Sequence, residues 1–207
     1  MNNIYRLIFI IPIFILGCTT NVIEENKVTK KIDNLDLNIF SKSGDKKYHI
    51  TSPYSIYNNI KDEFQFKKTT INIFSNGKTK YVVTSDESTL SDNNKVLEMR
   101  GNVKLKTIVQ SDDYLYADKF IWNIDETSYL LTGDIKYENK NVILTSGKAK
   151  LGVENIIEFF NPVKYVIKDE KNANFFETNS ENAYYDIDKE SLSFKAKDNR
   201  VRSKIYF

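Results

Sequence analysis

Two stretches of the chain, SDNNKVLEMRGNVKL at residues 91–105 and NIDETSYLLTGDIKY at residues 123–137, decide the fold. They align without a gap at an offset of 32 residues, so that Gly101 matches Gly133. In each stretch, a polar turn leads into a longer run in which apolar and polar residues alternate. A period of two is typical of a β-strand with one buried face, and its repetition predicts a stack of similar hairpins.

The same unit recurs, less regularly, along the rest of the chain. A weaker copy lies around residues 64–74, and later copies lie at residues 153–165 and 185–197. Groups of Gly, Asn, Asp and Ser separate the strands at short intervals, as turns require. No apolar stripe of helical spacing appears beyond the N-terminal leader. The sequence therefore predicts an all-β protein.

The alternation also assigns one face of each strand to the interior, because successive side chains of a strand point to opposite faces. Gly101 and Gly133 stand in mid-strand, where glycine usually marks a bulge or bend. Repeated bends at one height predict an elongated, twisted β-jellyroll of antiparallel hairpins with an open apolar interior. The residues expected to line this interior are Leu97, Met99, Val103, Leu105, Phe120, Trp122, Tyr129, Leu131, Ile135, Tyr137, Ile157, Phe159, Val163 and Tyr165.

The N-terminus has the features of a bacterial signal peptide. A single cationic side chain, Arg6, precedes the apolar run Leu7–Leu16. The run ends in ILGC at residues 15–18, which resembles a lipobox, so we expect residues 1–17 to be removed and Cys18 to be lipidated.

On this interpretation residues 18–31 form a polar tether and residues 32–207 form the β-domain. The alternative is an uncleaved transmembrane helix over Leu7–Ile23, at the short end of the length that spans a bilayer and interrupted by Pro12. Either anchor leaves the β-domain outside the cytoplasm, attached to a membrane by its N-terminus.

Composition excludes several classes of function. The net charge is only +2, which argues against a nucleic-acid binder. One Cys and one His cannot form a zinc site of thiolates and imidazoles, and one Cys cannot form a disulfide within the chain. His49 is expected on an exposed strand position, and the adjacent carboxylates Asp86–Glu87 and Asp112–Asp113 are expected to be solvated. We therefore expect no catalytic residues, no metal and no cofactor.

Several segments, taken together in their order along the chain, resemble the LptC and OstA-type periplasmic proteins of lipopolysaccharide export. The resemblance extends over roughly residues 30–167. The segments that carry it are residues 32–40, Gly44, residues 48–52, residues 97–105, residues 114–123 and residues 133–135.

The resemblance implies a β-jellyroll held at the periplasmic face of the inner membrane. Such a protein receives lipopolysaccharide from an inner-membrane ABC transporter and passes it to a soluble LptA-like jellyroll that docks by its edge strand. The familiar members carry a transmembrane helix, whereas this chain has a lipobox, which leaves the anchor and the contact with the transporter open.

The resemblance suggests a function for two parts of the chain. The inner face becomes a candidate lipid groove, although each of its residues could equally be a core residue. The terminal strand, expected over residues 193–207 with a break near Asp198-Asn199, becomes a candidate docking edge through Val201, Ser203, Ile205 and Phe207. Its cations could instead guard an edge strand against aggregation. The competing function is a structural or adhesive lipoprotein with a closed core.

Overall fold

The computed structural model describes residues 29–91, 93, 95–108, 113–124, 126, 128–140, 142–152, 154–160, 162–168, 174–197 and 200–206. The leader, Cys18 and most of the predicted tether lie outside these residues, as does Phe207. The first strand begins at Thr29, three residues before the predicted start of the β-domain.

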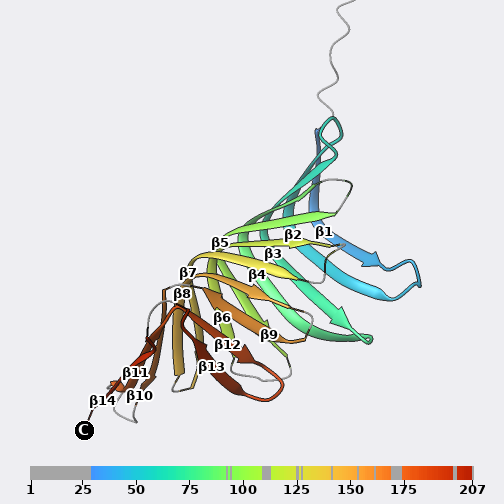
Figure 1. Ribbon diagram of the computed structural model, residues 1–207. Helices are drawn as coiled ribbons and strands as arrows, with labels where there is room; N and C mark the ends of the chain where they lie inside the picture. Colours follow the sequence, from blue (N-terminus) through green and yellow to red (C-terminus); the bar gives the residue numbers. More distant parts are fainter. Residues whose placement is uncertain are drawn as a thin grey trace, which may run out of the picture.

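The described residues form fourteen strands in one antiparallel arrangement, which confirms the all-β prediction (Figure 1). Strands β1 to β8 pair in the order of the sequence, so each strand lies next to the one that precedes it in the chain. The strands are β1 (Thr29–Phe40), β2 (Lys46–Asn58), β3 (Glu63–Ser75), β4 (Lys78–Ser91), β5 (Val96–Thr107), β6 (Tyr114–Asn123), β7 (Tyr129–Asn139), β8 (Val142–Leu151), β9 (Ile156–Phe160), β10 (Val163–Lys168), β11 (Asn174–Ser180), β12 (Asn182–Asp186), β13 (Ser191–Lys195) and β14 (Arg202–Ile205).

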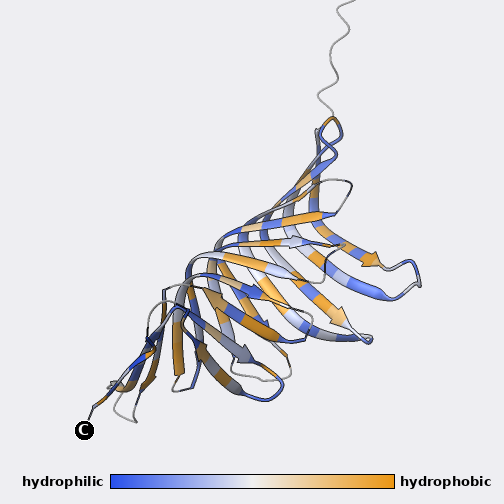
Figure 2. Cartoon of the chain, in the orientation of Figure 1, coloured by the Kyte–Doolittle hydropathy of each residue, from blue (hydrophilic) through white to orange (hydrophobic). Residues whose placement is uncertain are grey.

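The alternation of the sequence decides which side chains are inside. Orange and blue bands succeed each other along the strands in Figure 2, as a period of two requires. Of the fourteen residues predicted on the inner face, twelve are buried, and Tyr129 and Tyr165 are half-buried against the same core. Glu98, Arg100 and Lys104, predicted on the opposite face, are exposed or half-exposed. The predicted register is therefore confirmed.

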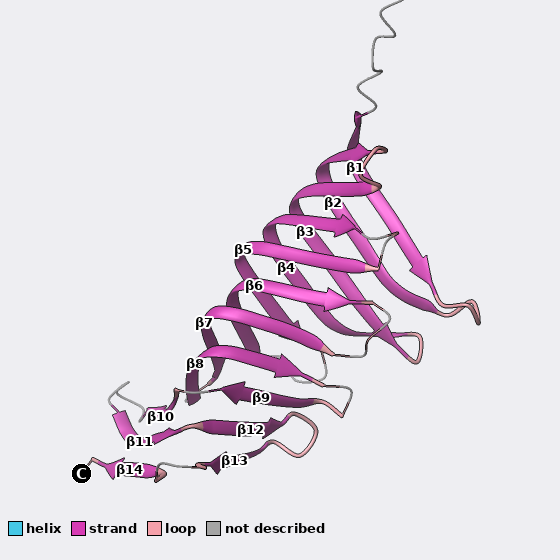
Figure 3. Cartoon of the chain, turned by 45° about the horizontal axis from the view of Figure 1, so that its top comes forward, coloured by secondary structure: helices cyan, strands magenta, loops and turns pink. Residues whose placement is uncertain are grey.

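Each long strand bends in the middle, and the bends fold the sheet over on itself into two layers (Figure 3). At the bend of β5 and β6, the pairing shifts between Arg100 and Val103, and Gly101-Asn102 takes the place of one residue of the partner strand. The same shift recurs in β7 between Thr132 and Ile135. The mid-strand glycines therefore mark β-bulges, as predicted.

Glycine is required at these bends for two reasons. Gly101 and Gly133 have φ angles of 71° and 74°, in the left-handed region that L-residues rarely adopt. A Cβ atom on either glycine would also crowd a carboxylate of the neighbouring strand, Asp86 or Asp118 respectively. The 32-residue repeat thus preserves an Asp–Gly pair at successive corners of the fold.

At other corners, serine hydroxyl groups donate hydrogen bonds to backbone carbonyl oxygens. Ser52, Ser85, Ser146 and Ser180 each donate a hydrogen bond to the carbonyl oxygen two residues further along the chain, at 2.7 to 3.0 Å. Such local bonds replace ladder hydrogen bonds that the bulges interrupt. The corners are therefore built from small polar residues and glycine, while the arms of the strands supply the core.

After β8 the two layers separate into different strands. The first half of β8 pairs with β10, and its second half pairs with β9. The first layer then continues through β11 and β14, and the second through β12 and β13. The repeat at residues 153–165 is consequently divided between β9 and β10 by a corner at Pro162, which has no N–H group to continue a ladder.

Candidate binding interior and edge strands

The space between the two layers is mainly apolar over β1–β10, β12 and β13. Aromatic rings from the two layers meet across it at successive levels, with ring centroids 4.8 Å apart for Tyr48 and Trp122 and 5.4 Å apart for Tyr165 and Phe194. Between these levels, Tyr137 lies 6.4 Å from Phe159. In the part of the chain that the structure describes, the apolar residues of this series belong to, or pack against, one continuous core.

The middle of this interior is filled by its own side chains. Phe120, Leu131 and Phe159 have no exposed surface, and they belong to the set predicted as a lipid groove. The structure therefore brings the predicted groove residues together, and it packs them against one another. Open space adjoins them in two hollows at the side opposite the bends.

The larger hollow has a volume of about 570 Å³ and lies between the tips of β1–β4 and those of β6–β8. Its wall includes Ile39, Ile73, Trp122 and Tyr129, and lysines stand around it. The lysines are Lys42, Lys47 and Lys80. The Nε1–H group of Trp122 is buried and has no acceptor among the described residues. An apolar wall with cations around it is suited to an anionic amphiphile.

The smaller hollow, of about 270 Å³, lies near the fork of the sheet, where β8 pairs with β10 in one layer and with β9 in the other. Tyr137, Leu144, Tyr165 and Tyr185 contribute to its wall, together with Lys140 and Glu190. Its composition is similar to that of the larger hollow, but one lysine and one glutamate line it, whereas three lysines and Glu126 line the larger hollow. The hollows thus differ in charge and share an aromatic wall.

A buried carboxylate supports the wall of the smaller hollow. Asp113 is only 1% exposed and accepts hydrogen bonds from Oη of Tyr137 at 2.9 Å and Nδ2 of Asn139 at 2.5 Å. The expectation of a solvated charge is therefore wrong for Asp113, while Asp112 lies outside the described residues. Sequence reasoning missed this site because both donors come from a different strand, β7, which covers Asp113 at the start of β6.

The phenol groups of the interior stay neutral. Burial raises the pKa of Tyr129 to about 12. Burial also raises the pKa of Tyr137, with further contributions from its hydrogen bond to Tyr185 and from the charge of Asp113. Since a neutral phenol combines an aromatic face with one hydroxyl group, the interior offers hydrogen bonds without fixed charge.

Both ends of the sheet present strands with one neighbour among the described strands. At the N-terminal end, β1 pairs with β2, and Phe40 at its end is 58% exposed. At the C-terminal end, β14 pairs with β11, and Ile205 is 56% exposed. The terminal segment contains β13 and β14, which lie in different layers, and the break predicted near residues 198–199 lies outside the described residues. The candidate docking residues Val201, Ser203 and Ile205 are exposed, and Phe207 lies outside the described residues.

The described residues carry no sign of a metal site, since no group of three or more His, Cys, Asp or Glu side chains gathers within them. His49 is half-buried on the outer face, where its Nε2 lies 3.0 Å from an oxygen of Asp36. Within the same part of the chain, no helix is long and apolar enough to cross a membrane. The predicted lipidation site, Cys18, and the alternative span Leu7–Ile23 lie outside it.

A family model and a solved structure each match part of the chain. The family model described as "Lipopolysaccharide-assembly, LptC-related" matches residues 13–146. No curated protein sequence matches the chain. Among solved structures, the crystal structure of LptH, the LptA homologous periplasmic component of the lipopolysaccharide transport device from Pseudomonas aeruginosa, is 16% identical with a TM-score of 0.49. That match covers 61% of this chain and 94% of LptH.

Proposed function

The chain belongs to the LptC-related family of lipopolysaccharide-assembly proteins, and on that premise we propose that it is a membrane-anchored periplasmic component of lipopolysaccharide export. A role in lipopolysaccharide transport follows from the family. The finer proposal is that the protein receives lipopolysaccharide from an inner-membrane ABC transporter and passes it through the interior to a soluble LptA-like jellyroll.

The continuous apolar interior is the observation that carries this proposal. Moving a lipid along a protein requires many similar weak contacts, and the aromatic and aliphatic residues between the layers offer them from Tyr48 to Phe194. The chain contains no phosphate-binding Gly-x-x-x-x-Gly-Lys loop. The energy for transport would come from the ABC transporter.

The larger hollow is the place where we propose that the lipid first contacts the protein. Lipopolysaccharide combines acyl chains with negatively charged groups. The wall around Trp122 and Tyr129 suits the acyl chains, and Lys42, Lys47 and Lys80 suit the negative groups. The Nε1–H group of Trp122 would find an acceptor in a lipid oxygen.

The edge strands suit the proposed contacts with other proteins. A strand with a free edge can extend the sheet of a partner by β-augmentation. β14, with Val201 beside it, is the candidate for docking the LptA-like jellyroll, and β1 at the other end is closest to the membrane anchor in the sequence. Arg202 and Lys204 would limit this edge to a specific partner, since cations on an edge discourage unspecific pairing.

The proposed anchor is the lipidated N-terminus at Cys18, with an uncleaved helix over Leu7–Ile23 as the alternative. Mass spectrometry of the N-terminal peptide from membranes distinguishes them. An acylated peptide that begins at Cys18 supports the lipoprotein, and an unmodified peptide that contains residues 1–17 supports the helix.

One observation favours a different function. The fully buried side chains at the centre are what a structural or adhesive lipoprotein with a closed core would have. Site-specific photocrosslinking in cells that make lipopolysaccharide decides between the two functions. A photoreactive residue replaces half-buried Tyr129 or Tyr165 on the inner face, and the matched controls replace Leu130 or Lys164, which point outward from the neighbouring positions.

Adducts with lipopolysaccharide at both inner positions and at neither outer position support the transport function. Adducts at no position, with the protein correctly located in the membrane fraction, support the closed-core function. Both inner residues line a hollow, so the substitution leaves the packed centre intact.

A further inference from the structure

The open side of the interior is bridged by a chain of hydrogen bonds between the two layers. Oη of Tyr81, on β4 in the first layer, lies 2.9 Å from Oδ1 of Asn155 in the turn between β8 and β9. Nδ2 of Asn155 donates to both carboxylate oxygens of Asp188, at 3.0 and 2.8 Å. Asp188 belongs to the turn between β12 and β13 in the second layer. Three segments far apart in the sequence are thereby joined through one asparagine.

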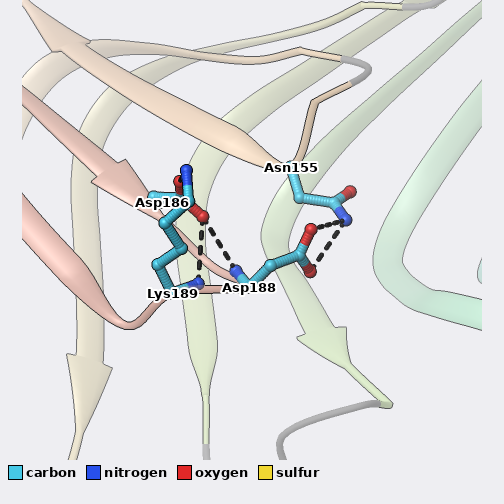
Figure 4. Close-up of polar contacts among 4 residues, drawn as sticks. All are labelled: Asn155, Asp186, Asp188 and Lys189. Atoms are coloured by element: carbon cyan, nitrogen blue, oxygen red, sulfur yellow. Dashed lines mark hydrogen bonds and ion pairs between the residues drawn. The ribbon is translucent and has the colours of Figure 1, made fainter.

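Local contacts hold Asn155 and Asp188 in place (Figure 4). Asp186 accepts hydrogen bonds from the backbone N–H groups of Asp188 and Lys189 and from Nζ of Lys189, which fixes the turn that carries Asp188. The backbone oxygen of Asn155 accepts a hydrogen bond from the N–H group of Ile187 at 3.0 Å. Asn155 has a φ angle of 58°, a left-handed conformation that suits asparagine or glycine.

The bridge lies beside the larger hollow. Tyr81, together with Lys80 and Gly152, lines that hollow, and the ring of Tyr81 lies 6.2 Å from that of Tyr129, edge to face. The hollow leads towards the buried residues that the proposed transport function requires a lipid to contact. Since Phe120, Leu131 and Phe159 have no exposed surface, the two layers must separate on this side before an acyl chain can contact them.

We propose that Tyr81, Asn155 and Asp188 form a latch that holds the two layers together across the open side of the interior, and that its release admits the lipid. The identity of what enters rests on the proposed function. Tyr81 lies within residues 13–146, which the family model matches, whereas Asn155 and Asp188 lie beyond them, so two of the three latch residues come from the C-terminal part of this chain. Hydrogen bonds between polar groups near the surface are well suited to this role, because water can replace them when the latch opens.

The chain carries its own probe of latch opening. Trp122 is the single tryptophan, it is 5% exposed, and it lies in the wall of the larger hollow. Quenching of its fluorescence by acrylamide measures how often the interior opens to solvent. The measurement uses the full chain in detergent micelles, and stopped-flow changes in the same fluorescence report the association of lipopolysaccharide.

Two variants remove the bond between the layers, and a third removes the bonds that hold Asn155 in position for Tyr81. Tyr81→Phe removes only the hydroxyl group and keeps the ring in the core. Asn155→Gly preserves the left-handed backbone and removes the amide. Asp188→Ala changes an exposed turn residue and leaves the core untouched. The matched control is Tyr57→Phe, which removes a phenol hydrogen bond of 2.8 Å to Asp62 within a single hairpin.

Each latch variant is expected to raise the quenching constant of Trp122 and the rate of lipopolysaccharide association by about fivefold, the size expected when one hydrogen bond is lost from the closed state. Tyr57→Phe is expected to leave both unchanged. Far-UV circular dichroism must show the same strand content for every variant compared. Because Asp188 is exposed, Asp188→Ala keeps the test available if Tyr81→Phe fails to fold.

The possible failures are distinguishable. Unchanged quenching in folded latch variants overturns the latch, whatever happens to lipid binding. Increased quenching with an unchanged association rate, in a protein that binds lipopolysaccharide, overturns its role in lipid entry. If neither the wild type nor any variant yields inner-face adducts with lipopolysaccharide, the proposed function fails, and the quenching result alone still decides whether the latch holds the layers together.

Discussion

The N-terminal and C-terminal parts of the molecule join the two layers in different ways. From β1 to β8, each long strand bends and contributes to both layers, so the backbone of a single strand couples them. From β9 to β14, the strands are only four to seven residues long, and each belongs to one layer. There the layers meet through side chains such as Tyr165 and Phe194. The comparison teaches that the backbone joins the layers in the N-terminal part, whereas side-chain packing joins them in the C-terminal part.

The largest expected loss of stability is at the packed centre of the N-terminal part. Phe120→Ala is expected to reduce the free energy of unfolding by about 3–5 kcal/mol, because it leaves a cavity among fully buried side chains. Phe194→Ala, at the half-buried end of the C-terminal part, should cost about 1–2 kcal/mol, since its site is already open to water. Urea denaturation followed by circular dichroism measures both. Equal losses would contradict the distinction between the two parts.

The bends supply the next largest expected effect. Gly133→Ala should destabilise the fold by about 1–3 kcal/mol, because alanine is strained at a φ of 74° and its Cβ would crowd Asp118. Gly147, at the bend of β8, is the matched control, since it has no positive φ and nothing lies within 4 Å of its Cβ position. Gly147→Ala should change the stability by at most about 0.5 kcal/mol. The same urea titration tests the pair, and a costly Gly147→Ala would refute the explanation.

Tyr137 links the buried carboxylate of Asp113 to Tyr185 in the C-terminal part, and the removal of its hydroxyl group sharpens the comparison. Tyr137→Phe takes one donor from Asp113 and a hydrogen-bond partner from Tyr185 of β12, so we expect a loss of about 1–3 kcal/mol. Tyr116→Phe removes a 3.3 Å bond to Glu138 on the outer face and should cost less than about 0.5 kcal/mol. Thermal unfolding of the two variants provides the measurement. A larger effect at Tyr116 would show that the buried site does not couple the parts.

The smallest expected effect is on the pH dependence of stability, through a carboxylate in the C-terminal part. Hydrogen bonds from Lys164 and Asn179 lower the pKa of Glu177, which lies on β11, below its ordinary value of 4.5. A lowered pKa means that the carboxylate stabilises the fold fully above pH 4.5 and that this contribution is lost as the pH falls through the lower folded value. Between pH 7 and pH 3, the melting temperature of the wild type should therefore fall further than that of Glu177→Gln. Parallel melting curves at the two pH values would exclude this contribution.

Much of the fold could be read from residues close together in the sequence. The alternation around Leu97 and Met99 predicted the inner face, and the spacing of Gly101 and Gly133 predicted the bulges. Both features depend on the backbone alone, because side chains alternate along any strand and because glycine tolerates the left-handed region. The C-terminal segment over residues 193–207 was expected as one interrupted terminal strand, whereas the structure divides it into β13 and β14, which lie in different layers.

Other features depended on residues that are distant in the sequence. Asp113 looked like a solvated charge, yet Tyr137 and Asn139 of the next strand cover it. The fork after β8 was missed because the repeat continues through Pro162, while the strand does not. The bridge from Tyr81 through Asn155 to Asp188 spans more than a hundred residues of sequence.

The sequence by itself thus determined the strand content, the register, the inner face and the bends, because each depends on the conformation of a few neighbouring residues. Only the tertiary structure decided how the layers meet: which side chains pack at the centre, where the hollows remain and which polar groups bridge the open side. These depend on the curvature accumulated over successive bends, which brings the tip of one hairpin against that of another several strands away. The alternation of residues along one strand does not show which distant hairpin tips come into contact.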